Sequence, residues 1–99
     1  MKFNIQFVKM QDSGAMSEHV INKLNKLRDK YDQIIGANVF FKYENNSDKN
    51  GKICEIDLSV PGANIFASSN KTNYEMAVKE TIQELEIQLK KRKASIKAH

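Results

Sequence analysis

Lysine side chains recur at helical spacing in two separate parts of the sequence. The first line consists of Lys23, Lys26 and Lys30, and the second consists of Lys90, Lys93 and Lys97, with Lys79 earlier in the same segment. Residues three and four apart lie on one side of a helix, so each line aligns its ammonium groups. Two lines that border a common surface can follow the phosphates of a nucleic acid backbone. The alternative is that the lysines only keep two amphipathic helices soluble.

Positive charge is concentrated at the carboxyl end of the chain. The formal net charge is +4, from 16 basic and 12 acidic residues, yet residues 88–99 contain no acid. The basic residues of this segment are Lys90, Lys91, Arg92, Lys93 and Lys97. A local basic patch is typical of proteins that bind a polyanion, although lysines at a helix end also complement the helix dipole. A membrane surface is disfavoured, because the core is expected to take the apolar side chains of Leu89 and Ile96.

No arrangement of residues indicates catalysis or a metal site. Cys54 alternates with Ile56 and Leu58, which favours a small core residue over a nucleophile. His19 and His99 are far apart in the sequence, and together with Cys54 they are too few for a zinc cluster. The four glycines are isolated, so no phosphate-binding loop is present. We therefore expect a protein that is not an enzyme and needs no cofactor or metal ion.

The apolar periodicity predicts the elements that position these lysines. Strands are expected at residues 2–7, 39–44, 53–60 and 64–69, and helices at residues 14–31 and 73–97. Ser13 is expected to cap the first helix, with Ser17 as the alternative. Thr72 is expected to cap the second helix, with Glu75 completing a capping box. Gly36 is expected to end the segment that follows the first helix.

The predicted order of elements, β-α-β-β-β-α, defines an α+β fold with a four-stranded mixed sheet. The first helix is a right-handed crossover between parallel strands, whereas the polar loop at 45–51 and a type II turn at Pro61-Gly62 join the later strands antiparallel. Each strand has one strongly apolar face, so both helices should cover that face and run roughly parallel. A second helix of about 37 Å exceeds a strand of about 20–23 Å, so its basic end should extend beyond the sheet.

The length and composition favour a single domain at residues 1–99. The chain has 99 residues, which is within the range of one domain. It contains no apolar run long enough to cross a membrane and no pattern of a signal peptide. A single cysteine fits a reducing compartment. We therefore expect a cytoplasmic protein.

Aromatic side chains on the open face of the sheet offer a second way to bind RNA. Phe40 and Phe66 are candidates, because some RNA-binding domains stack bases on exposed sheet aromatics. The alternative is that these two rings are simply packed or partly exposed and bind no RNA. Because residues 39–41 are all apolar, the alternation of that strand does not decide which face Phe40 occupies. Glu55 is expected on the same face, in a cross-strand pair with Lys42.

Three segments, taken in order with the predicted elements, resemble a known family over nearly the whole chain. They are the run Lys23-Leu24-Asn25-Lys26-Leu27, the passage from Phe66-Ala67-Ser68 to Glu75, and the ending Gln88-Leu89-Lys90-Lys91-Arg92-Lys93. The chain is similar to the ribosome hibernation-promoting factor family, which includes the ribosome-associated inhibitor YfiA, in its short form. Lys23 and Lys26 match the lysines of the family's first helix. Gln88, Leu89, Lys91 and Lys93 match its second helix.

The resemblance implies a fold like that of a double-stranded RNA-binding domain and a function on the ribosome. It implies binding to the small ribosomal subunit at the decoding region, over the mRNA channel and the A and P tRNA sites. This would stop translation under stress or in stationary phase. The rRNA-binding residues that we predict are Lys23, Lys26, Lys30, Lys79, Lys90, Lys91, Arg92, Lys93 and Lys97. The protein is expected to be a monomer off the ribosome.

The sequence departs from the family pattern at two positions of the second helix. Glu84 and Ile87 stand where the family commonly has basic residues, so the middle of this helix is less cationic than the resemblance implies. Ile87 is two residues from both Leu85 and Leu89, so we expect it to lie away from the core. Because the chain ends at His99, we expect it to lack the additional domain of the long family form. A general double-stranded RNA-binding module and a protein-interaction adaptor with incidental lysines are the competing hypotheses.

Overall fold

A computed structural model describes residues 2–45, 48 and 51–97, and for residues 93–97 it describes the backbone alone. The elements in chain order are β1 (Lys2–Phe7), α1 (Gly14–Lys30), β2 (Gly36–Tyr43), β3 (Lys52–Val60), β4 (Ala63–Lys71) and α2 (Tyr74–Lys97). The predicted order β-α-β-β-β-α is therefore confirmed.

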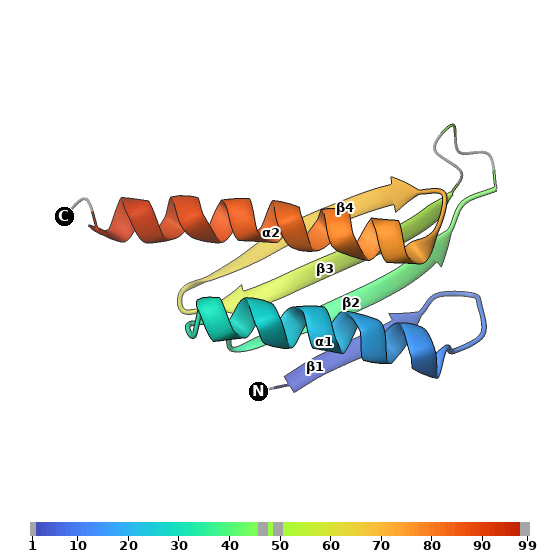
Figure 1. The fold of residues 1–99 in the computed structure, drawn as a ribbon, viewed down its shortest axis with the longest axis horizontal. Helices are drawn as coiled ribbons and strands as arrows, with labels where there is room; N and C mark the ends of the chain where they lie inside the picture. The colour runs from blue at the N-terminus through green and yellow to red at the C-terminus, as the bar shows by residue number, and fades with distance from the viewer. Residues whose placement is uncertain (1, 46–47, 49–50, 98–99) are drawn as a thin grey trace.

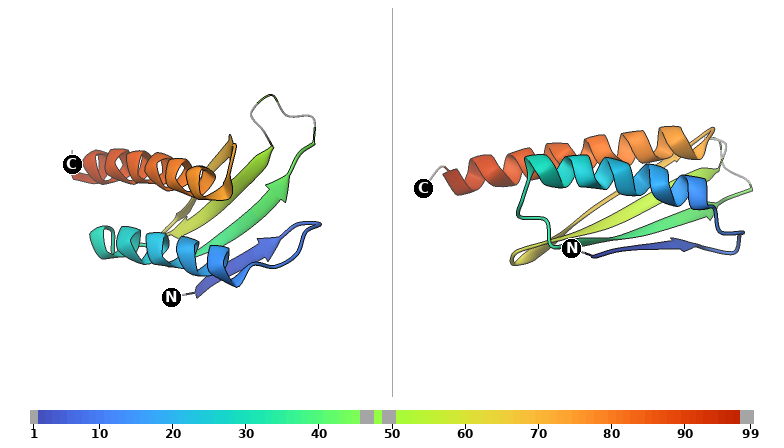
Figure 2. Two further views of the ribbon diagram at one scale, coloured as in Figure 1. Left: turned by 45° about the vertical axis from the view of Figure 1, so that its right-hand side comes forward. Right: turned by 60° about the horizontal axis from the view of Figure 1, so that its bottom comes forward.

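The four strands form one mixed sheet in the order β1-β2-β3-β4. β1 pairs with β2 in parallel, and β2, β3 and β4 pair in antiparallel fashion, as predicted. Both helices lie side by side on one face of the sheet and run in the same direction (Figure 1). Figure 2 shows the two layers from the side, with the other face of the sheet left open. The end of α2 extends past the turn between β3 and β4, so the expected overhang is also confirmed (Figure 1).

The core lies between the sheet and the two helices. Alternate residues of β3, including Cys54, Ile56 and Leu58, are fully buried, as the alternation predicts. The helices contribute one stripe each, made of Val20, Leu24 and Leu27 from α1 and of Ala77, Val78, Leu85 and Leu89 from α2. Ile82 is only partly buried. Ile96, which was also expected in the core, has no described side chain.

A buried polar residue, Thr81, completes the stripe of α2. Its hydroxyl lies 2.7 Å from the carbonyl oxygen of Ala77 and 3.2 Å from that of Cys54. A buried hydroxyl needs such a partner, because leaving its hydrogen bond unmade costs about 1–3 kcal/mol. Thr81 therefore ties α2 to β3 from within the core.

The start of β2 differs from the prediction. β2 begins at Gly36, three residues before the predicted start at residue 39, and Gly36 opens the strand rather than ending the segment before it. Gly36 pairs with Lys2 of β1, and a Cβ atom on Gly36 would lie 2.7 Å from the carbonyl oxygen of Lys2. Glycine is required here because the backbone of β1 passes too close for any side chain.

The turn between β3 and β4 lies at Pro61-Gly62, where the sequence predicts a type II turn. Gly62 has a φ of +79°, the left-handed value that the second central position of a type II turn requires. Pro61 precedes it at the position where a fixed negative φ is favourable. The carbonyl of Pro61 also accepts a hydrogen bond from the guanidinium of Arg92, which fastens α2 to this turn.

The helix caps confirm one prediction and correct another. Ser13 caps α1, and its hydroxyl accepts a hydrogen bond from the backbone N–H of Met16 at 3.2 Å. The prediction of Thr72 as the cap of α2 was wrong. The side-chain oxygen of Asn73 accepts from the N–H of Met76 at 2.8 Å, while the Thr72 hydroxyl donates to the sulfur of Met76 at 3.4 Å. Both residue types are good caps, and the helix begins one residue later than the pattern indicated.

We expect Asn73→Ala to lower the free energy of unfolding by about 1 kcal/mol, because it leaves an N-terminal N–H of α2 without its partner. Urea denaturation followed by circular dichroism measures this difference. Thr72→Ala is the matched control and should change the stability by less than about 0.5 kcal/mol. A larger loss with Thr72→Ala than with Asn73→Ala would contradict the assignment of the cap.

Candidate nucleic-acid interface

The lysines of α1 point into a groove between the two helices. Val20, Leu24 and Leu27 face the sheet, so the lysines at intermediate positions of the helix lie along its side. One cleft of about 150 Å³ lies between α1 and α2. Its lining consists of Lys23, Lys26, Leu27, Lys30, Ile82 and Glu86. The predicted first line of lysines is thus brought together along one wall of this cleft.

A second cleft continues the first toward the start of α2. It has a volume of about 270 Å³ and is lined by His19, Lys23, Asn73, Glu75, Met76 and Lys79. Lys23 lines both clefts, so they form one continuous surface, which we call the inter-helix groove. Lys79 contributes a cation from α2 opposite the lysines of α1. The groove therefore has lysines on both sides, although Lys79 is the one member of the predicted second line that its described lining contains.

Two acidic residues interrupt the positive lining of the groove, Glu75 in the second cleft and Glu86 in the first. The Oε2 atom of Glu86 accepts from the ammonium of Lys30 at 3.4 Å and from the hydroxyl of Tyr31 at 3.5 Å. The pKa of Tyr31 is raised, first by burial and then by the negative charge of Glu86. The Glu86 side chain is 24% exposed and that of Lys30 is 65% exposed, so the ion pair contributes at most about 1 kcal/mol.

Glu86 was not predicted as a groove residue. The sequence does indicate its position in the groove, because Glu86 lies four residues after Ile82 and seven after Lys79. These intervals correspond to one and two turns of a helix, so all three residues occupy the side of α2 that faces α1.

Of the basic residues at the end of α2, the three whose side chains are described, Lys90, Lys91 and Arg92, do not line the groove. Lys90 follows Glu86 by one turn and is exposed, and Lys91 is exposed as well. Arg92 is held against the β3–β4 turn through its hydrogen bond to the carbonyl of Pro61. Lys93 and Lys97 belong to α2, but their side chains lie outside the described residues. The assignment of these residues to RNA binding stays a prediction.

The open face of the sheet is less suited to RNA. Phe66 is 54% exposed and Phe40 is half-buried, which confirms that both lie on this face. Their partners on β3 are acidic, since Phe40 pairs with Glu55 and Phe66 with Asp57. Glu55 forms the predicted ion pair with Lys42 at 2.9 Å. Negative charge between the two aromatic rings opposes a phosphate backbone, so base stacking here stays a hypothesis without support from the charges.

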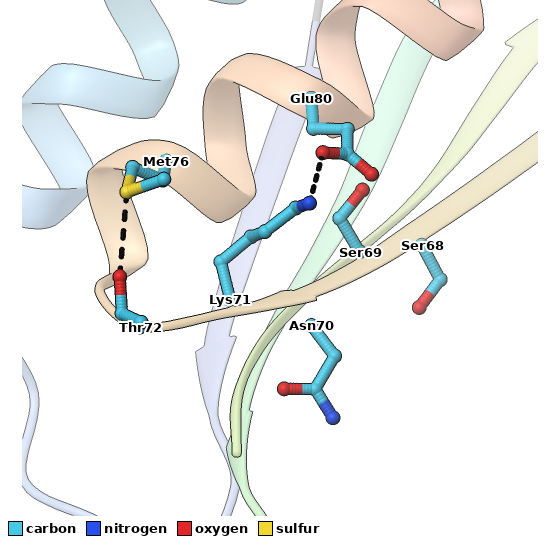
Figure 3. Close-up of a pocket in the computed structure, with 7 residues that line it drawn as sticks. All are labelled: Ser68, Ser69, Asn70, Lys71, Thr72, Met76 and Glu80. Carbon is cyan, nitrogen blue, oxygen red and sulfur yellow. Dashed lines mark hydrogen bonds and ion pairs between the residues drawn. The ribbon is translucent and has the colours of Figure 1, made fainter. Parts of the chain in front are cut away.

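Another hollow lies away from the groove, between β4 and the start of α2 (Figure 3). It has a volume of about 510 Å³ and is lined by Ser68, Ser69, Asn70, Lys71, Thr72, Met76 and Glu80. The ammonium of Lys71 lies 2.6 Å from a carboxylate oxygen of Glu80, as the dashed line in Figure 3 marks. The cation of this hollow is therefore already paired, unlike the lysines at 23, 26 and 79, for which the described residues show no ion pair.

Three features of the described residues bear on catalysis and membranes: the Cys54 thiol, the arrangement of metal-binding side chains and the hydropathy of the helices. Cys54 is fully buried, and burial raises the pKa of its thiol to about 12, which keeps it protonated and unreactive at neutral pH. Within residues 2–45, 48 and 51–97, no group of His, Cys, Asp or Glu side chains is arranged to hold a metal ion. No helix in the described part of the chain is long and apolar enough to cross a bilayer.

The fold and the groove define a small α+β domain that presents lysines between two parallel helices, a type of surface that attracts polyanions. The chain belongs to the family described as Sigma 54 modulation protein / S30EA ribosomal protein, which matches residues 3–97. A relative from Pseudomonas putida, named ribosome hibernation promoting factor, is 26% identical over 93 residues, covering 94% of this chain and 87% of the relative. The predicted family resemblance is therefore confirmed.

Two solved structures share the fold. A ribosomal subunit interface protein from Coxiella burnetii superposes with a TM-score of 0.80 at 24% identity, covering 95% of this chain and 99% of the other. The N-terminal domain of Protein Y from Thermus thermophilus superposes with a TM-score of 0.72 at 20% identity, covering 91% and 93%. At this level of identity, the two structures confirm the α+β fold.

Proposed function

We propose that this protein is a non-catalytic ribosome hibernation factor. It binds the small ribosomal subunit at the decoding region, where it blocks the mRNA channel and the A and P tRNA sites and so inhibits translation under stress or in stationary phase. The observation that carries the proposal is the inter-helix groove, with lysines of α1 and α2 on its two sides. The family membership and the name of the Pseudomonas putida relative support a role on the ribosome.

The groove would act through charge and shape. Lys23, Lys26 and Lys79 would neutralise rRNA phosphates, each releasing condensed counterions and fixing the orientation of the domain. The exposed Lys90 and Lys91 would extend these contacts along the overhang of α2. The rigid pair of helices would then occupy the volume that mRNA and tRNA need. No step in this mechanism requires a cofactor, a metal ion or a bond rearrangement.

The proposal extends to the state of the protein in the cell. Residues 1–99 act as a single ribosome-binding domain in the cytoplasm, where the ribosomes are, and the protein is a monomer when it is not bound.

A general double-stranded RNA-binding module is the alternative, and such modules recognise the shape of about 16 base pairs without regard to the ribosome. Binding to isolated small subunits, compared with binding to a plain RNA duplex, distinguishes the two functions.

We expect the double variant Lys23→Glu/Lys26→Glu to bind small subunits at least about tenfold more weakly at moderate salt, because it loses two phosphate contacts and adds two repulsive charges. Equilibrium titration of labelled protein with small subunits measures the effect. The two side chains lie off the buried stripe, so the thermal unfolding transition should stay close to that of the wild type.

Lys2→Glu/Lys52→Glu is the matched control, since it makes the same change in net charge at positions away from the groove. The control should bind nearly as well as the wild type. Equal weakening in both double variants would show that only the overall charge matters. Equal affinity of the wild-type protein for a plain duplex and for small subunits would favour the general RNA-binding module.

Ile87 tests a position where the sequence departs from the family pattern. Its side chain is 47% exposed, which confirms that it lies away from the core. We expect Ile87→Arg to bind small subunits more tightly, with a log–log salt slope steeper by about 0.7–0.9, because it adds one phosphate contact. Titration at two salt concentrations measures both quantities. Ile87→Gln is the uncharged control, and weaker binding by both variants would show that Ile87 makes an apolar contact with its partner instead.

A further inference from the structure

We propose that the cleft around Glu86 binds one unpaired nucleobase that carries an exocyclic amino group, such as cytosine, from the RNA that the groove lysines hold. This inference rests on the proposed function, and it adds a base-reading site to a surface that otherwise contacts only phosphates. The site consists of the apolar side chains of Leu27 and Ile82, the carboxylate of Glu86 and the surrounding lysines.

The size and walls of the cleft suit a single base. The cleft, with a volume of about 150 Å³, is open to the surface between the helices, so one flat ring can enter it beside Glu86. The partly buried Ile82 of α2 supplies apolar surface, and Leu27 of α1 lines the cleft with little exposed area of its own. Unpaired bases are commonly recognised by packing against side chains while their edges form hydrogen bonds.

The charges around the cleft orient the nucleotide. Lys23, Lys26 and Lys30 are all part of its lining, so a phosphate bound at the rim would leave the attached base beside the cleft. A phosphate would not occupy the interior itself, because Glu86 would repel it. A carboxylate within a lysine-lined groove is unfavourable for phosphate binding alone, and an accepting role toward a base explains its presence.

Glu86 retains the capacity to accept a further hydrogen bond. Both of the contacts described for it, from Lys30 at 3.4 Å and from Tyr31 at 3.5 Å, fall on the Oε2 atom. A carboxylate has about four acceptor positions on its two oxygens, so Oε1 can accept from an amino group. Glutamate accepts from N4 of cytosine, whereas uracil presents a carbonyl oxygen at the same position and would be repelled.

The test compares two RNA hairpins that are identical except for one bulged nucleotide, which is either cytosine or uracil. We expect the wild-type protein to bind the cytosine hairpin at least about fivefold more tightly, which is the lower end of the discrimination by one good base contact. Fluorescence anisotropy at fixed salt measures both dissociation constants. Equal affinities, tighter binding of the uracil hairpin, or no binding to either would overturn the inference.

Glu86→Gln identifies the residue responsible. The glutamine amide can donate to uracil as well as accept from cytosine, so the preference should fall to less than about twofold. Glu84→Gln is the matched control, because it makes the same change in charge two residues away, at an exposed position outside the groove lining. This control should keep the full preference. A preference that persists in Glu86→Gln would overturn the role of Glu86, and its loss in both variants would do the same.

Binding to small subunits separates this inference from the proposed function. A wild-type protein that binds small subunits yet shows no preference between the hairpins would retain the proposed function and lose the base site. A clear hairpin preference without binding to small subunits would retain the base site and contradict the proposed function. If Glu86→Gln weakened binding to small subunits but left the hairpin preference intact, Glu86 would contact a cationic group of the subunit, and its role in reading the base would be rejected.

Discussion

The single apolar face of the sheet is the constraint on which the rest of the structure depends. Each strand directs most of its apolar residues to one side, and a sheet of this kind must be covered on that side. Both helices therefore share one surface. The first crosses between the parallel strands β1 and β2, and the second follows β4, so the helices lie side by side and in the same direction (Figure 1). The inter-helix groove is a direct consequence of this arrangement.

The groove places charges from distant parts of the chain next to each other. Lysines of α1 face Lys79 and Glu86 of α2, which lie 49 to 63 residues later in the sequence. Because these residues belong to helices packed against a common core, the spacing of their backbone positions is set before any ligand arrives. Binding a phosphate backbone then requires the lysine side chains to be ordered, but not the chain that carries them. The overhang of α2 adds further cations beyond the edge of the sheet.

Periodicity was sufficient to predict the individual elements, and general rules for connecting strands and covering a sheet then predicted their arrangement. The alternation of β3 and the stripe of α1 are local properties, and both were confirmed. The features that sequence reasoning missed depend on contacts between elements. Thr81 is buried because α2 packs on β3, and Glu86 lies in the groove because α1 lies beside α2. The cap of α2 was misplaced by one residue because Thr72 and Asn73 are both suitable, and only the backbone path selects Asn73.

The central claim is that the groove side of this protein occupies the decoding region of the small ribosomal subunit. Chemical footprinting of the rRNA in isolated small subunits, with and without saturating protein, tests it most directly. The account predicts new protections that cluster at the nucleotides of the decoding region and along the adjoining mRNA channel. Protections confined to another part of the subunit, or an unchanged pattern at saturation, would contradict it.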